Sequence, residues 1–143
     1  MDAKACSVHR LVADVAALAD GKVLLVRYKD ARKYDGQKGW FLPDDFLNYE
    51  EHPRDAAVRI LREQAGIAVD APELRYIESF GGGPSGAWHL IFHHAVAMPS
   101  PPLVRPGANV AAAEWFPVGG LPPNKEIAHG GWAADVLAEI LRR

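Results

Sequence analysis

Residues 39–67, GWFLPDDFLNYEEHPRDAAVRILREQAGI, decide the fold, because they predict a short strand, a loop and one amphipathic helix in succession. Pro43 is expected to end the strand. Pro53 suits a first helical turn, where its missing N–H is not needed. Gly66 suits the left-handed position just past a last turn. The helix is therefore expected to begin near Pro53 and to stop at Gly66.

The predicted helix has an apolar face and a charged face. The apolar stripe consists of Ala56, Ala57, Ile60 and Leu61. The opposite side carries Asp55, Arg59, Arg62 and Glu63, where opposite charges three or four residues apart can pair. Ile60 is therefore expected in the core. Arg59 and Glu63, taken alone, are expected to form a surface ion pair.

The same stretch resembles the Nudix box of the Nudix hydrolase superfamily, whose pattern is Gly-x5-Glu-x7-Arg-Glu-apolar-x-Glu-Glu-x-Gly-apolar. The box falls on residues 45–67, and the wider resemblance covers residues 8–142. The preceding WFLP is similar to the W-x-L-P lead-in of the family. The positions that match the box are Glu51, Arg59, Leu61, Glu63, Gly66 and Ile67.

Three kinds of substitution separate the stretch from the family pattern. Asp44 and Asp45 stand where the family usually has Gly-Gly. Ile60 replaces the Glu that follows the Arg, and Gln64 replaces the second Glu of the later pair. The function of the chain depends on what these substitutions do to the site.

The resemblance implies cleavage of a phosphoanhydride in a nucleoside diphosphate derivative or another nucleotide, with Mg²⁺ or Mn²⁺ as cofactor. It implies Glu63, Glu51 and Arg59 as catalytic residues. It leaves Glu63, with Gln64 as a weak neutral ligand, to hold the metal. Losing two carboxylates should weaken Mg²⁺ binding by several kcal/mol, if the effective dielectric is about 20. Restoring both, by Ile60→Glu with Gln64→Glu, is expected to raise metal affinity.

The sequence is therefore compatible with two functions. The first is a divergent Nudix hydrolase whose catalysis is weakened or lost. The alternative is a non-catalytic nucleotide- or partner-binding module on the same fold. Arg27, Asp44 and Asp45 are the candidate substrate-binding residues. The two aspartates either supply a relocated carboxylate to the metal or are merely solvated or helix-capping acids.

His89 and His93 lie at even spacing on one face of a predicted strand. Histidine titrates near neutral pH, so either residue could replace a missing base. The simpler interpretation is that both are ordinary strand residues. Metal ligation by the pair is disfavoured, because no third ligand is evident nearby in the sequence.

Length and composition limit the classes of protein to which the chain can belong. A length of 143 residues suits one domain, 1–143. A net charge of −2 gives no basic footprint for nucleic acid. No apolar run approaches the roughly 20 residues that span a membrane. The single cysteine, Cys6, forms no internal disulfide and suits a reducing cytosol, so we expect a cytoplasmic protein.

The remaining elements complete an α/β fold. Residues 8–18 and 23–28 predict a hairpin around Asp20-Gly21, and residues 74–80 and 88–98 a second hairpin across the GGGPSG connection. A strand at 113–117 and a closing helix follow. The order β-β-β-α-β-β-β-α predicts a mixed sheet with a helix on each side, which is the Nudix α/β/α sandwich. An exposed apolar edge in the first hairpin would permit a homodimer.

Overall fold

The computed structural model describes residues 9–34, 36–82 and 86–143. The order of its strands and long helices is the predicted one. Two short 3-10 helices, η1 (Arg32–Tyr34) and η2 (Asn124–Glu126), lie in the connections. The strands and helices are β1 (His9–Ala19), β2 (Lys22–Tyr28), β3 (Asp44–Phe46), α1 (Pro53–Ala65), β4 (Glu73–Gly81), β5 (Trp88–Met98), β6 (Val110–Pro117) and α2 (Ala128–Arg142).

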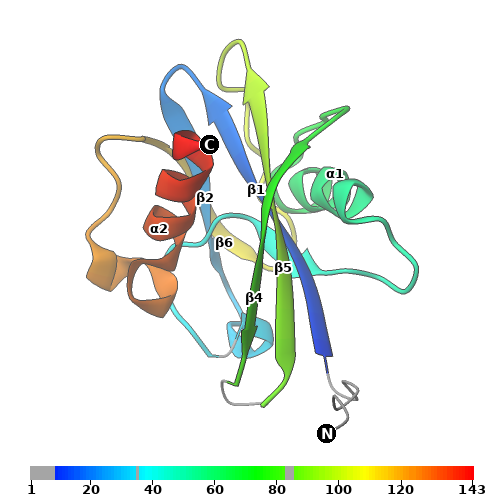
Figure 1. Ribbon diagram of the computed structural model, residues 1–143. Helices are drawn as coiled ribbons and strands as arrows, with labels where there is room; N and C mark the ends of the chain where they lie inside the picture. The colour runs from blue at the N-terminus through cyan, green and yellow to red at the C-terminus, as the bar shows by residue number, and fades with distance from the viewer. Residues whose placement is uncertain (1–8, 35, 83–85) are drawn as a thin grey trace, which may run out of the picture.

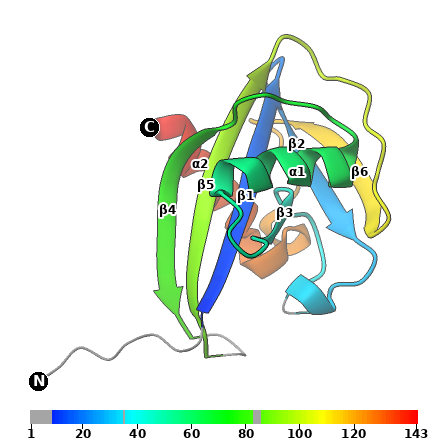
Figure 2. The same ribbon diagram turned by 90° about the vertical axis from the view of Figure 1, so that its right-hand side faces the viewer.

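The strands form one mixed sheet between two helices. Its order is β4-β5-β1-β2-β6, and β3 also pairs with β1. The β1–β5 pair is parallel and the other pairs are antiparallel. Helices α1 and α2 cover opposite faces of this sheet (Figures 1 and 2). The predicted α/β/α sandwich is therefore confirmed.

The first hairpin opens away from its turn and admits the chain that leads to α1. At the turn, Leu18 faces Val23 in the antiparallel register. Further along, β3 pairs with β1, while Val26 and Phe41 exchange backbone hydrogen bonds of 2.9 and 2.8 Å. Residues 40–46 are thus held in the split between β1 and β2.

The first hairpin is also internal to the sheet, whose outer strands are β4 and β6. The expected apolar edge in this hairpin is therefore wrong, and with it the basis given for a homodimer. The reason is that β1 acquires β5 as a parallel partner and β2 acquires β6. Both partners come from distant parts of the chain.

Pro43 does not end a strand, as the sequence had suggested. Trp40 and Phe41 make isolated bridges, and β3 begins immediately after the proline. Proline lacks a donor but keeps its carbonyl, which here accepts a 3.1 Å hydrogen bond from the Val15 amide. The residue therefore fits at the entrance of a strand.

Helix α1 has the predicted bounds. Its N-cap is His52, whose side chain accepts a 3.0 Å hydrogen bond from the Arg54 amide. Gly66 follows the last turn with φ 67°, the left-handed conformation that glycine adopts without strain. Helix α2 is regular only after residues 129–131, which all have positive φ.

The sheet has a core on each face. One core joins Ala13, Val15 and Leu24 to the apolar stripe of α1, including the fully buried Ile60. The other joins Leu25 and Trp40 to α2. The prediction of Ile60 as a core residue is confirmed. Neither helix among the described residues is long and apolar enough to cross a membrane.

Candidate functional site

The guanidinium of Arg59 lies at the centre of the box. It donates hydrogen bonds of 2.9 and 3.0 Å to Glu51, 3.1 Å to Asp45 and 3.2 Å to Glu63. A further 3.0 Å bond reaches the Phe46 carbonyl. The hydrogen bonds of Arg59 lower the pKa of Glu51 in spite of partial burial. Arg59 therefore ties the middle of α1 to β3 and to the loop between them.

We expect Arg59→Met to lower the free energy of unfolding by about 2 kcal/mol. The variant would leave the partly buried Glu51 without its counter-ion, and the cost is below that of a fully buried pair because the cluster retains some solvent. Urea unfolding would measure the loss. Arg54→Met, an exposed change on the same helix, is the control and should lie within about 0.5 kcal/mol of wild type. Equal effects in the two variants would contradict a central role for Arg59.

Gln64 is bound to its surroundings through both atoms of its amide. Its Oε1 accepts a 2.8 Å hydrogen bond from the Tyr28 hydroxyl, and its Nε2 donates a 2.7 Å hydrogen bond to the Asp44 carbonyl. The side chain is buried. Gln64 thus closes the space between α1, β2 and β3, and its oxygen is already engaged with Tyr28.

The residues present do not fit the divalent metal that the box resemblance implies. Magnesium takes hard oxygen ligands, usually carboxylates, at octahedral positions. Ile60 has no ligand atom, the Gln64 oxygen is engaged, and Glu63 is 52% exposed beside Arg59. Within residues 9–34, 36–82 and 86–143, no group of three or more His, Cys, Asp or Glu side chains could hold a metal ion.

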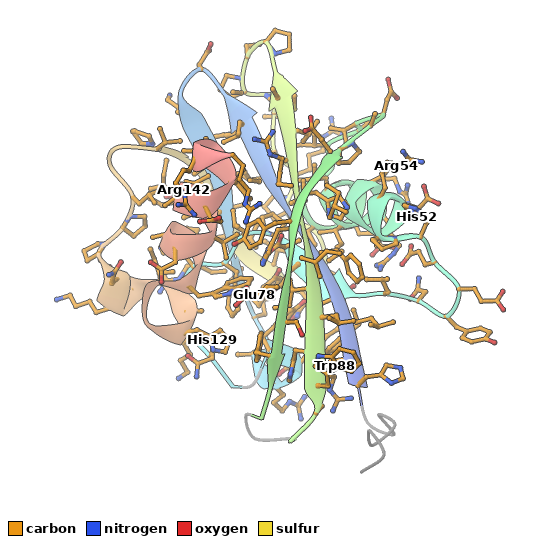
Figure 3. The ribbon with its side chains drawn as sticks, viewed as in Figure 1. His52, Arg54, Glu78, Trp88, His129 and Arg142 are labelled. Carbon is orange, nitrogen blue, oxygen red and sulfur yellow. The ribbon has the colours of Figure 1, made fainter. Side chains whose placement is uncertain are left out.

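A cavity of about 380 Å³ lies on the α2 side of the sheet. This volume falls in the range of small-molecule sites. Glu78 on β4 and His129 at the start of α2 line it, whereas His52 and Arg54 lie on the α1 side (Figure 3). Its other lining residues are Arg10, Val12, Lys33, Tyr34, Gln37, Phe41, Asp44, Asp45, Phe46, Phe80, His89, Ile91 and Trp132.

The two aspartates of β3 connect the cavity to the box. Asp45 lines the cavity and also bonds Arg59, and it pairs with Lys33. Asp44 is only 8% exposed. Burial, and then the charges of Asp14 and Asp45, raise the pKa of Asp44 well above its usual range. Neither residue caps α1, since that cap is His52, and neither has positive φ.

A hydrogen-bonded network of Asp14, His93 and Glu78 lies next to the cavity, which Glu78 lines. His93 Nδ1 contacts Asp14 at 2.7 Å, and its Nε2 contacts Glu78 at 2.9 Å. An imidazolium, with an N–H on each nitrogen, satisfies both contacts. Burial alone would lower the pKa of His93, but its hydrogen bond to Asp14 and that to Glu78 raise it. Burial raises the pKa of Asp14 against the influence of His93.

The structure brings together most, but not all, of the predicted site residues. Glu51, Glu63 and Asp45 converge on Arg59. Arg27 is elsewhere, with its guanidinium 5.2 Å from the centre of the Trp40 ring and outside the cavity lining. Residues 83–85 of the GGGPSG connection lie outside the described part of the chain.

Sequence reasoning missed Asp14 and Glu78. Asp14 is one acid inside the apolar strand LVADVAALA, and this was a usable signal for a buried polar role. Glu78 carried no comparable signal. His89 and His93 do share the cavity face, as the period of two predicted: His89 stacks on Phe80, and His93 bonds Glu78. His93 is a buried network residue, which is close to the simpler interpretation.

The protein is thus an α/β/α sandwich with a box helix, an arginine-centred acid cluster and a cavity against the sheet. A family model described as NUDIX domain matches residues 8–138. The chain therefore belongs to the Nudix hydrolase superfamily. No curated protein matches the chain significantly.

Solved Nudix structures share this fold. A MutT NUDIX hydrolase from Burkholderia pseudomallei has TM-score 0.74 and 23% identity, over 91% of this chain and 96% of that one. The Nudix domain of Shewanella oneidensis NrtR, complexed with ADP ribose, has TM-score 0.73 and 20% identity, over 99% and 94%. A C. elegans Ap4A hydrolase has TM-score 0.68 and 15% identity, over 93% and 98%. At these identities the likeness establishes the fold alone.

Proposed function

We propose that this chain is a nucleotide-binding Nudix domain in which phosphoanhydride hydrolysis is weakened or lost. The ligand is a nucleoside diphosphate derivative or a related nucleotide. The observation that carries the proposal is the state of the two substituted box positions. Ile60 is fully buried in the core, and the Gln64 amide is engaged with Tyr28 and Asp44. Of the three helix glutamates in the family pattern, Glu63 remains.

Binding is supported by what the substitutions leave intact. The cavity keeps aromatic walls, with Tyr34, Phe41 and Trp132 among its lining residues. Arg10 and Lys33 supply positive charge at the same cavity, which suits phosphate oxygens. The solved Nudix domain of Shewanella oneidensis NrtR is complexed with ADP ribose, which supports nucleotide binding as the function of this fold here. Function nevertheless depends on the site and not on the fold.

The test separates binding from turnover. Purified protein would be incubated with nucleotide sugars, dinucleoside polyphosphates, and nucleoside di- and triphosphates, with Mg²⁺ or Mn²⁺. We expect a ligand at one hundred times its Kd to stabilise the fold by about 2.7 kcal/mol. We expect little or no product in the same mixture. Rapid metal-dependent turnover that disappears in Glu63→Gln would overturn the loss of catalysis, and the absence of any thermal shift would overturn nucleotide binding.

A further inference from the structure

One carboxyl oxygen at the cavity lacks a hydrogen-bond donor in the free protein. Asp44 Oδ1 is buried and makes no hydrogen bond. Among the described residues, the other buried side-chain atom in this state is Trp115 Nε1, and Trp115 does not line the cavity. Leaving a buried polar atom unpaired is costly, so each such atom requires a reason. Because Asp44 lines the cavity, a ligand in that cavity can supply the missing donor.

A second acid of the cavity is held firmly in place. Glu78 Oε1 accepts a 2.9 Å hydrogen bond from His93 Nε2 and a 3.4 Å hydrogen bond from Trp132 Nε1. His93 is itself fixed by the fully buried Asp14. Among the described residues, the other Glu78 oxygen, Oε2, accepts no hydrogen bond. The carboxylate is therefore oriented from behind and keeps acceptor capacity for a ligand.

The walls of the cavity suit a flat ring. Phe46, Phe80 and Trp132 line it together with Tyr34 and Phe41. Tyr34 is already stacked on Tyr28 at 3.9 Å between ring centres, so this aromatic surface is ordered. Aromatic side chains bind planar heterocycles by stacking, with little dependence on the identity of the ring. Selectivity for one ring over another must then come from the carboxyl groups of Asp44 and Glu78.

We propose that the cavity selects a planar ring with an edge of adjacent N–H donors, as in guanine, and that Asp44 and Glu78 accept hydrogen bonds from that edge. The inference rests on the proposed nucleotide-binding function and deepens it. Carboxylates accept hydrogen bonds and reject an edge that offers only acceptors. Adenine offers an amino group beside a ring acceptor, and hypoxanthine has the ring N–H without the amino group.

The proposal is particular to this chain. Asp44 stands where the family pattern usually has glycine, which has no side chain to read a ring. In the structure its backbone has ordinary negative φ, so no local strain accounts for the choice of residue. A buried acceptor oxygen without a donor is expected of a group whose hydrogen-bond donor comes from a bound ligand. Sites built to bond a ligand donor discriminate strongly against an analogue that lacks it.

The experiment uses calorimetry on the full chain with guanosine, inosine and adenosine diphosphates. We expect the guanosine compound to bind about tenfold more tightly than the inosine compound, which lacks one donor, and the adenosine compound to bind more weakly than the guanosine compound. Asp44→Asn should lower guanosine diphosphate affinity by about tenfold and move the guanosine-to-adenosine ratio toward one, because its NH₂ faces a donor edge. Glu78→Gln should act in the same direction.

The controls distinguish a recognition role from a structural one. Asp135→Asn, an exposed change on α2, should leave all three affinities within about twofold of wild type. Asp44→Asn replaces the buried carboxyl by an amide of nearly the same shape, so the variant should fold, and its melting temperature checks this. Equal binding of the three nucleotides, or a loss in Asp44→Asn that is the same for all bases, would overturn the ring-edge proposal while the proposed function stands. Failure of all three to bind would overturn both.

Discussion

Ile60→Glu, which restores the family residue, is expected to lower the free energy of unfolding by at least ~4 kcal/mol. Ile60 is 0% exposed and packs with Ala13, Val15 and Leu24 beneath α1. A carboxyl at that position either stays ionised without a partner or takes up a proton and remains unpaired. Since domains of this size have only about 5–15 kcal/mol of stability, much of the variant would be unfolded. Urea unfolding followed by circular dichroism measures the loss.

This expectation corrects the one drawn from the sequence, in which Ile60→Glu with Gln64→Glu would raise metal affinity. Gln64→Glu adds a second cost, because a carboxylate would face the Asp44 carbonyl that now accepts from the Gln64 amide. Two controls isolate the effect. Ile60→Leu conserves volume and should cost less than about 1.5 kcal/mol. Arg62→Glu places the same acid on the exposed face of α1 and should cost about 1 kcal/mol or less. A stable Ile60→Glu protein that binds Mg²⁺ would show that α1 can present this position to the site.

The order of the elements was predictable because each signal is local. Pro53 and Gly66 mark the ends of α1 in the sequence and in the structure. Asp20-Gly21 marks the first turn, and its residues adopt positive φ. The internal place of the first hairpin was not predictable in this way. It depends on β5 and β6, which pair with β1 and β2 from positions about eighty to ninety-five residues further along.

The site shows the same division. The amphipathic pattern alone placed Ile60 in the core, and the box spacing brought Glu51, Arg59 and Glu63 together. The Asp14–His93 contact depends on the parallel register of β1 and β5, which places these two residues opposite one another. Glu78 reaches His93 from β4, beyond a register shift between Leu74 and Tyr76. Neither the register nor the shift has a signature in the sequence.

His93→Phe is expected to lower the free energy of unfolding by about 3 kcal/mol at pH 6. Asp14 and His93 are both 0% exposed, so the variant leaves a carboxyl in the sheet interior with no partner. Phenylalanine keeps an aromatic ring beside Tyr76, whose ring centre lies 4.5 Å from that of His93, so the loss reports the polar contact more than the packing. Urea unfolding of both proteins measures the difference.

A double-mutant cycle with Asp14→Val tests whether loss of the Asp14–His93 contact causes the destabilisation of His93→Phe. When both partners are removed, no buried charge of this pair remains, and Asp14→Val with His93→Phe should be more stable than His93→Phe alone by about 2 kcal/mol.

The pH dependence of stability is a second test of the Asp14–His93 ion pair. Because the pKa of His93 is raised above its ordinary value of 6.5, the wild-type protein holds the full ion-pair stabilisation below that pH and loses it as the pH rises through the folded-state value. His93→Phe cannot show that loss. If the stability of His93→Phe follows the wild-type pH curve in this range, the stabilisation comes from other groups. The same conclusion holds if the effects of the two substitutions in the cycle simply add.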